Sequence, residues 1–438
     1  MIRLACPQQT RLKISLFHPA LPVIMSGMKD LIKKIPKEKA FIIYLLRNSI
    51  YDSFDLPSHR FIKQDIDWTA VLSAAISYKI EPLIYYELNK RYGINSSLPS
   101  PVINALTSYY EKTLKKNTLL WQEFCRITDT LREKEIDYLP LKGIILIKTV
   151  YSNIGIRKMS DIDILIRSKD VDVVTNDLLR LGYKKIRDDA KNHYTYINDT
   201  ISNDKIEVDV HTKFRYGVDK NSLPSEIWQK KKSYTIDGKE TGVPSPEDLF
   251  LCLASNICYR RLLKNLYDMA SLLQKYKGDF DWDYVLKEAG KDGYLRTCAF
   301  FALFCLKKLL NTDIYDAHIN KIKINYLRQI TIEYVLTKRL TSESYAVLER
   351  RFKLLRYVIF PGEIKLSAVM LHHRIANGRH LKETVDLKLG LSDNKQVRFR
   401  GMKILIRNII FSFIISYKVL RFYLIKKPLR SICGTQLQ

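Results

Sequence analysis

The run from Asp161 to Ile166 reads Asp-Ile-Asp-Ile-Leu-Ile and places the strictest constraint on the fold of this chain. Successive side chains of an extended strand point to opposite faces, so Asp161 and Asp163 share one face and the isoleucines share the other. Hard divalent cations such as Mg²⁺ prefer oxygen ligands and take one or two protein carboxylates together with substrate phosphates. The run therefore predicts a strand with an apolar back and a metal-binding front, with a strand of solvated acids as the alternative.

A phosphate-binding turn is predicted just before these acids. Tyr138–Leu141 has the pattern of a short strand, and Ile144–Tyr151 has that of the first turns of a helix. Between them, Gly143 lets the backbone approach an anion closely, and Lys142 adds a positive charge to the free N–H groups of the helix start. The Lys142-Gly143 pair is much shorter than a full P-loop motif, so the prediction of a phosphate-binding turn rests on its position just before the acids.

A second alternating run follows downstream at Ile206–His211. Glu207, Asp209 and His211 share one face of this predicted strand, and apolar residues occupy the other face. If the strand lies beside the first, Asp209 completes a three-carboxylate cluster, with Glu207 as the competing third acid. His211 is a supporting residue that can orient substrate or a ligand carboxylate, although a structural role is the alternative.

Two polar residues near the start of the acid strand are candidates for contacting a nucleotide. The planar guanidinium of Arg157 matches phosphate geometry, and the hydroxyl of Ser160 can donate a hydrogen bond to phosphate. A solvated loop arginine and a serine that only begins the strand are the alternatives.

Together these segments resemble the uncharacterised nucleotidyltransferase family of the DNA polymerase β-like superfamily. The resemblance is densest over residues 136–215 and rests on four segments in the family's order: Leu141–Gly143, Arg157–Leu165, Leu178–Tyr183 and Val208–His211. Weaker similarity extends to Asp67–Val71, Ile80–Ile84, Pro244–Asp248 and Leu266–Met269. The superfamily has a Gly-Gly or Gly-Ser pair ahead of its acids, whereas this chain has Lys142-Gly143.

The resemblance implies a metal-dependent enzyme that moves a nucleoside monophosphate from a nucleoside triphosphate to an acceptor and releases pyrophosphate. It implies that Asp161, Asp163 and Asp209 are the catalytic acids and metal ligands, holding two Mg²⁺ ions or alternatively Mn²⁺. It also makes Gly143 the position where phosphate approaches, and ATP the expected donor. The acceptor is a hydroxyl, a phosphate or a protein side chain, with a sugar derivative or a protein ranked above nucleic acid. The competing interpretation is a catalytically silent nucleotide-binding or interaction module, membrane-associated or similar to a toxin–antitoxin component.

The pattern along the rest of the chain predicts an α+β fold with a small mixed β-sheet nucleotidyltransferase core between helical regions. We expect a helical lead-in at residues 36–135, the α/β core at 136–243 and a helical domain at 244–392. Residues 1–35 form an N-terminal extension, for which disorder is one interpretation.

The last segment, residues 393–438, accounts for part of the formal net charge of +27. From Asn394 onward it contains basic but no acidic residues. Within it, residues 402–425 have an imperfect amphipathic pattern whose apolar run is too short for a transmembrane helix, which needs about 20 residues. A helix lying on an anionic membrane surface is the functional interpretation, and a helix packed on protein is the structural one.

Cysteine usage and the N-terminal sequence bear on the compartment. The seven cysteines are scattered and odd in number, so neither a disulfide framework nor a zinc motif is predicted. Prolines interrupt the apolar stretches before Met25, and no signal-peptide pattern forms. We therefore expect a cytoplasmic protein that can lie at the periphery of a membrane.

Overall fold

The computed structural model describes residues 35–51, 66–93, 98–189, 192–200, 205–213, 226–257, 262–291, 293–310, 316–324 and 326–341. Its N-terminal helices are α3 (Lys37–Tyr51), α5 (Trp68–Tyr78), α6 (Glu81–Tyr92) and α7 (Ser100–Glu133). Its core elements are β1 (Tyr138–Leu141), α8 (Gly143–Thr149), η1 (Ile154–Ile156), β2 (Asp161–Ile166), η2 (Ser168–Asp170), α9 (Val171–Arg180), β3 (Lys184–Asp189), β4 (His193–Asn198), β5 (Ile206–His211), β6 (Lys232–Ile236) and β7 (Lys239–Val243). Its C-terminal helices are α10 (Pro246–Ile257), α11 (Leu262–Lys275), α12 (Trp282–Lys291), α13 (Gly293–Leu310), α14 (Asp316–Lys321) and α15 (Tyr326–Thr341).

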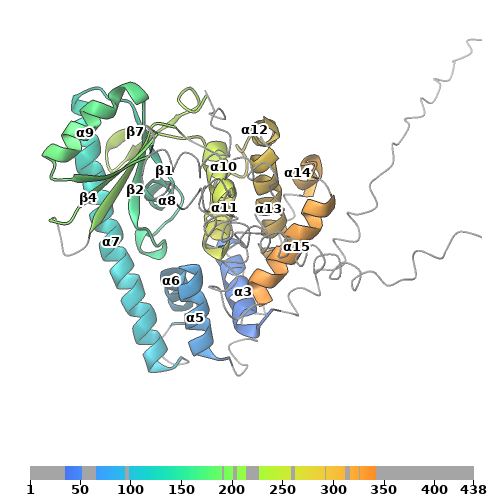
Figure 1. Cartoon of the computed structure of the whole chain (residues 1–438). Coiled ribbons are helices and arrows are strands. Elements are labelled where there is room, and N and C mark those ends of the chain that lie inside the picture. The colour runs from blue at the N-terminus through green and yellow to red at the C-terminus, as the bar shows by residue number, and fades with distance from the viewer. Residues whose placement is uncertain are drawn as a thin grey trace, which may run out of the picture.

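The sheet in the described part of the chain is mixed and has the strand order β1-β2-β5-β4-β3. β2 and β5 run parallel, and every other pairing in this sheet is antiparallel. A parallel pair needs a crossover connection, which α9 and the antiparallel strands β3 and β4 supply here. Figure 1 shows this sheet on one side of the molecule and helices α10 to α15 on the other. The predicted α+β fold, with a small mixed sheet between helical regions, is confirmed.

The apolar faces of the two alternating runs form part of the core. Ile162 and Ile166 on β2 are fully buried, and so are Ile206 and Val208 on β5. Their acidic neighbours alternate to the other face, as the period of two requires. The apolar core on this face fixes the register, because a slip of one residue would turn the carboxylates into the apolar core and the isoleucines toward the acidic face.

Helix α7 braces the sheet and the loop that leads into β2. Its 34 residues begin with a proline in the first turn, where the missing N–H costs nothing. Its buried side chains include Leu120, Phe124 and Ile127, which recur at helical spacing. Helix α7 therefore lies within the region 36–135 that the sequence pattern predicts to be helical.

Two pairs of neighbouring helices are separated by short breaks. The chain breaks between α5 and α6 at Lys79, which has a φ of +56°, and Pro82 lies in the first turn of α6. Helix α10 ends at Ile257, and α11 begins at Leu262.

Several predictions fall on residues that the structure does not describe. These are the N-terminal extension, the basic tail at 393–438 and its amphipathic segment at 402–425, together with residues 342–392 of the predicted helical domain. Among the described helices, none combines the length and the apolar character needed to cross a bilayer.

Candidate functional site

The register of the central strands brings the predicted acids together. Asp161 lies beside Glu207 across the parallel β2–β5 pair, and Asp163 lies beside Asp209. Residues that are paired across neighbouring strands project to the same face. All four carboxylates therefore share one face of the sheet, with Asp163 and Asp209 at its centre.

Lys142 places a cation among these acids. It occupies the turn between β1 and α8 with φ +53° and ψ −120°, a backbone conformation that non-glycine residues rarely adopt. Its ammonium lies 2.5 Å from Asp163 Oδ1. An unfavourable backbone at such a position is held by its surroundings, here a turn that is closed by a buried strand and a buried helix.

The two acids of β2 have opposite electrostatic environments. Burial opposes ionisation of Asp163, but Lys142 and the hydrogen bond from His211 outweigh it and lower the pKa of Asp163 well below its usual range. Burial and the neighbouring charges of Asp163 and Asp209 raise the pKa of Asp161, and Lys142 offsets only part of this. The negative charges of the acid cluster therefore exceed the one positive charge that Lys142 supplies, and part of their mutual repulsion remains.

Strand β4 adds residues to the site that the sequence did not reveal. His193 pairs with His211 across the antiparallel β4–β5 ladder, and Thr195 pairs with Asp209. The hydroxyl of Thr195 donates a hydrogen bond of 2.7 Å to Asp209 Oδ1. This bond and the nearby His193 lower the pKa of Asp209, although burial acts in the opposite direction.

The two histidines stand side by side on this face. Their rings are stacked with centroids 4.6 Å apart and an angle of 7° between their planes. His211 Nε2 lies 2.8 Å from Asp163 Oδ1, and His193 Nε2 lies 3.1 Å from Asp209 Oδ1. Burial, which is the largest effect, lowers the pKa of His211.

Arg157 is held by a carboxylate of the helical region. Its Nε lies 2.8 Å from Asp268 Oδ1 and its Nη2 lies 2.9 Å from Asp268 Oδ2, which is the bidentate geometry of a strong pair. Tyr151 donates a further hydrogen bond to Asp268, and Lys264 Nζ lies 3.2 Å from it. Two nitrogens of the guanidinium that was predicted to contact phosphate are therefore bound to Asp268. Through this pair, Arg157 anchors the loop before β2 to α11.

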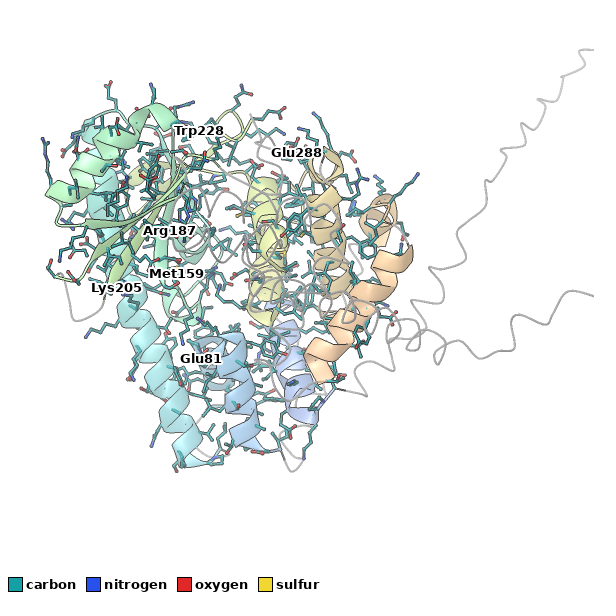
Figure 2. All side chains as sticks on the ribbon, viewed as in Figure 1. Glu81, Met159, Arg187, Lys205, Trp228 and Glu288 are labelled. Atoms are coloured by element: carbon teal, nitrogen blue, oxygen red, sulfur yellow. The ribbon has the colours of Figure 1, made fainter. Side chains whose placement is uncertain are left out.

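Gly143 has no room for a side chain. A Cβ at this position would lie 2.6 Å from Arg157 Nη1 and 2.8 Å from Met159 Sδ. Figure 2 labels Met159 in the middle of the molecule, between the sheet and helices α10 and α11. Glycine is thus required here for close packing of the turn against the loop that leads into the acid strand.

A cavity of about 440 Å³ opens in front of the acids of β2. Ser160 lies in its wall, and the rest of the lining comes from the Lys142 turn, the loop before β2 and helices α10 and α11. The charged side chains in its lining are four cations, Lys142, Arg157, Lys158 and Lys264, and two acids, Asp161 and Asp163. A cavity of this size and charge suits a small polyanion.

The donor set fits a divalent cation. Asp161, Asp163 and Asp209 offer carboxylate oxygens from adjacent parallel strands, and burial together with the charges of Asp163 and Asp209 raises the pKa of Asp161. A bound cation would relieve the repulsion between these charges. The three carboxylates would hold it on this face of the sheet, beside the cavity that Asp161 and Asp163 line.

Sequence reasoning missed two groups of residues. His193 and Thr195 lie in a strand of alternating polar and aromatic residues whose partner only the β4–β5 register identifies. Asn256, Lys264 and Asn265 reach the cavity from helices about 100 residues farther along the chain. The weak similarity at Leu266–Met269 was the available signal, because it includes Asp268.

Comparisons with known proteins identify the family of this chain. No curated protein matches the chain. A crystal structure of an antigenic nucleotidyltransferase-like protein from Paracoccidioides brasiliensis is similar to it at 16% identity and a TM-score of 0.29, covering 49% of this chain and 94% of that one. The family model described as "Uncharacterised nucleotidyltransferase" matches residues 64–311, more than half of the chain, and this chain belongs to that family.

Proposed function

We propose that this protein is a metal-dependent nucleotidyltransferase that moves a nucleoside monophosphate from a triphosphate, ATP in the first instance, to an acceptor and releases pyrophosphate. The observation that carries the proposal is the parallel β2–β5 pair, which aligns Asp161, Asp163 and Asp209 on one face beside a cation-rich cavity. A purely structural core has no need of three carboxylates on one face, since burying like charges together is costly.

The chemistry requires positive charge where negative charge develops. An acceptor oxygen attacks the α-phosphorus, and charge accumulates on the attacking, equatorial and departing oxygens. Two Mg²⁺ ions, when bound, would supply this stabilisation. Asp161 and Asp163 would hold them, while Asp209 would also accept the proton of the attacking hydroxyl.

The cavity supplies the contacts for the triphosphate. Lys142 lies on the sheet side, Lys158 lies in the loop before β2, and Lys264 lies on α11, so the cations surround the opening from different elements. Asn256 and Asn265 place amide groups in the same lining, and amides both donate and accept hydrogen bonds. The acceptor is a hydroxyl, a phosphate or a protein side chain, with a sugar derivative the first class to screen.

Calorimetric titration with each nucleoside triphosphate, with and without Mg²⁺, tests the proposal. We expect metal-dependent binding in the wild type and its loss in the Asp161→Asn, Asp163→Asn double variant. Glu207→Gln is compared with Asp209→Asn, because Glu207 lies on the same face beside Asp161 and is the competing third acid. Release of pyrophosphate and transfer of an α-labelled nucleotide then test turnover, and equal activity in the double variant would place the site elsewhere.

One observation favours a second function, nucleotide binding without turnover. Lys142 Nζ lies 2.5 Å from Asp163 Oδ1, so a side chain of the protein already neutralises the central acid. In that case triphosphate binding would not depend on Mg²⁺ and would survive the Asp161→Asn, Asp163→Asn change. The calorimetric experiment separates the two functions.

A further inference from the structure

His193, Asp209 and His211 form a cluster that the carboxylate site alone does not explain. One ligand atom from each residue lies within 4.8 Å of the others. All three residues are half-buried and project from adjacent strands, with His193 directly opposite His211. Two imidazoles and a carboxylate thus meet at one side of the three-carboxylate cluster.

The position of His193 Nε2 points to a ligand. This nitrogen is buried and faces Asp209 Oδ1 at 3.1 Å, but the contact lies outside hydrogen-bond geometry, and no other group in the described part of the structure forms a hydrogen bond with it. A buried polar atom that lacks a well-formed hydrogen bond costs about 1–3 kcal/mol and calls for an explanation such as an ion. A metal ion between His193 Nε2 and the Asp209 carboxylate would satisfy both.

The cluster is also held in place by its neighbours. The hydroxyl of Thr195 donates to Asp209 Oδ1 and fixes the carboxylate, and the stacked imidazole rings restrict each other. Partners of this kind orient metal ligands and strengthen their binding. The arrangement is therefore preorganised on rigid strands rather than on a loop.

We propose that His193, Asp209 and His211 bind a transition-metal ion of the Co²⁺ or Zn²⁺ class in preference to Mg²⁺. Imidazole nitrogen suits these ions, whereas Mg²⁺ selects oxygen ligands and keeps several waters. Three protein ligands leave a coordination position open for water or a substrate oxygen. The inference deepens the proposed function because Asp209 belongs to both sites. Metal binding itself does not depend on that function, and only a role of the ion in nucleotide transfer rests on it.

Titration of the metal-free, full-length protein with Co²⁺ alone tests the inference without requiring turnover. We expect visible d–d absorption and calorimetric binding of Co²⁺, with affinity reduced at least tenfold in His193→Gln and in His211→Gln. Mg²⁺ binding should be weaker than Co²⁺ binding in the wild type and unchanged in His193→Gln. His318→Gln is the matched control, because His318 is stacked on Trp282 in the helical region, with centroids 4.3 Å apart.

The outcomes distinguish this inference from the proposed function. Co²⁺ binding that is identical in the wild type and His193→Gln overturns the inference, as does wild-type binding of Mg²⁺ that is as tight as that of Co²⁺. Circular dichroism of each variant shows that a lost signal reflects lost ligands rather than unfolding. Selective Co²⁺ binding without nucleotide transfer supports the metal site and contradicts the proposed function. Transfer with Mg²⁺ but without selective Co²⁺ binding supports the proposed function and contradicts the metal site.

Discussion

At the scale of single residues, Lys142, Gly143 and Arg157 each have a structural role beside the acid strand. Lys142 holds a rare backbone conformation and neutralises Asp163, while Gly143 beside it is required for packing. Arg157 uses its bidentate face to bind Asp268 rather than solvent. These three residues line the cavity and also fix the turn and the loop beside the acid strand.

Replacing Gly143 with alanine should therefore impair both stability and activity. The new Cβ would overlap with Arg157 Nη1 and Met159 Sδ, and both side chains are buried and have little freedom to move. Overpacking of this kind costs about 1–3 kcal/mol, which urea denaturation would measure. Gly290→Ala is the control, because nothing lies within 4 Å of a Cβ there. Equal stability of the two variants would show that the turn adapts.

The Arg157–Asp268 pair should make stability depend on pH in the acid range. Burial opposes ionisation of Asp268, but Arg157 and Lys264 lower its pKa from 3.8 to about 2. A carboxyl whose folded pKa is depressed stabilises the fold above its unfolded pKa, and this contribution disappears as the pH falls through about 2. The free energy of unfolding of the wild type should decrease more steeply with acid than that of Asp268→Asn. Parallel curves for the two proteins would contradict this.

At the scale of elements, the loop between α8 and β2 determines where the acids begin. The buried side chain of Asn117 on α7 donates hydrogen bonds to the carbonyls of Ile154 and Arg157, the second at 2.8 Å. Gly155 in the same loop leaves space for Tyr110 of α7, since a Cβ there would lie 2.9 Å from its ring. Helix α7 thus positions a loop that it does not adjoin in sequence.

Asn117→Ala should loosen this loop and weaken nucleotide binding. Two buried carbonyls would lose their donor, and each unsatisfied group costs about 1–3 kcal/mol. We expect a lower melting temperature and faster hydrogen exchange at residues 154–157. Thr118→Ala is the neighbouring control, since its hydroxyl donates a hydrogen bond to Leu114 O within the same helix. Unchanged exchange in Asn117→Ala would assign the loop's order to other contacts.

At the scale of the whole molecule, the sheet and the helical regions depend on each other. The cavity has one wall from the core and another from α10 and α11, and Asp268 links that wall to Arg157. Helix α3 also packs on α11 and α13, so the N-terminal and C-terminal helices are in contact (Figure 1). The division into separate regions at residues 136–243 and 244–392 remains a prediction about the chain.

A fragment of residues 35–243 tests that division. Arg157 would lose Asp268 together with the helices that help to bury this ion pair, and the apolar surfaces that pack against those helices would be exposed to water. We expect the fragment to unfold without cooperativity and to bind no triphosphate, as judged by circular dichroism and calorimetry. The fragment 35–341, which contains all the described residues, is the control and should behave as the full chain does. Cooperative unfolding of the shorter fragment would mean that the core is an independent domain.

The sequence by itself determined the parts of the fold that local periodicity encodes. Alternation placed Asp161 and Asp163 on one face and Ile162 and Ile164 on the other, and helical spacing located α7, because both periods follow from backbone geometry alone. The family similarity then supplied the order in which strand, turn and acid strand occur. Neither requires knowledge of which segments meet.

Only the tertiary structure decided which residues from distant segments meet at the site. The register of β4 on β5 placed His193 beside His211. The packing of α11 on the loop before β2 brought Arg157 into an ion pair with Asp268 and away from solvent. Strand pairing and helix docking are long-range events, set by the burial of whole apolar faces and by the pairing of buried charges. No local pattern in the chain contains that information, which is why His193 and the helical wall of the cavity came from the fold alone.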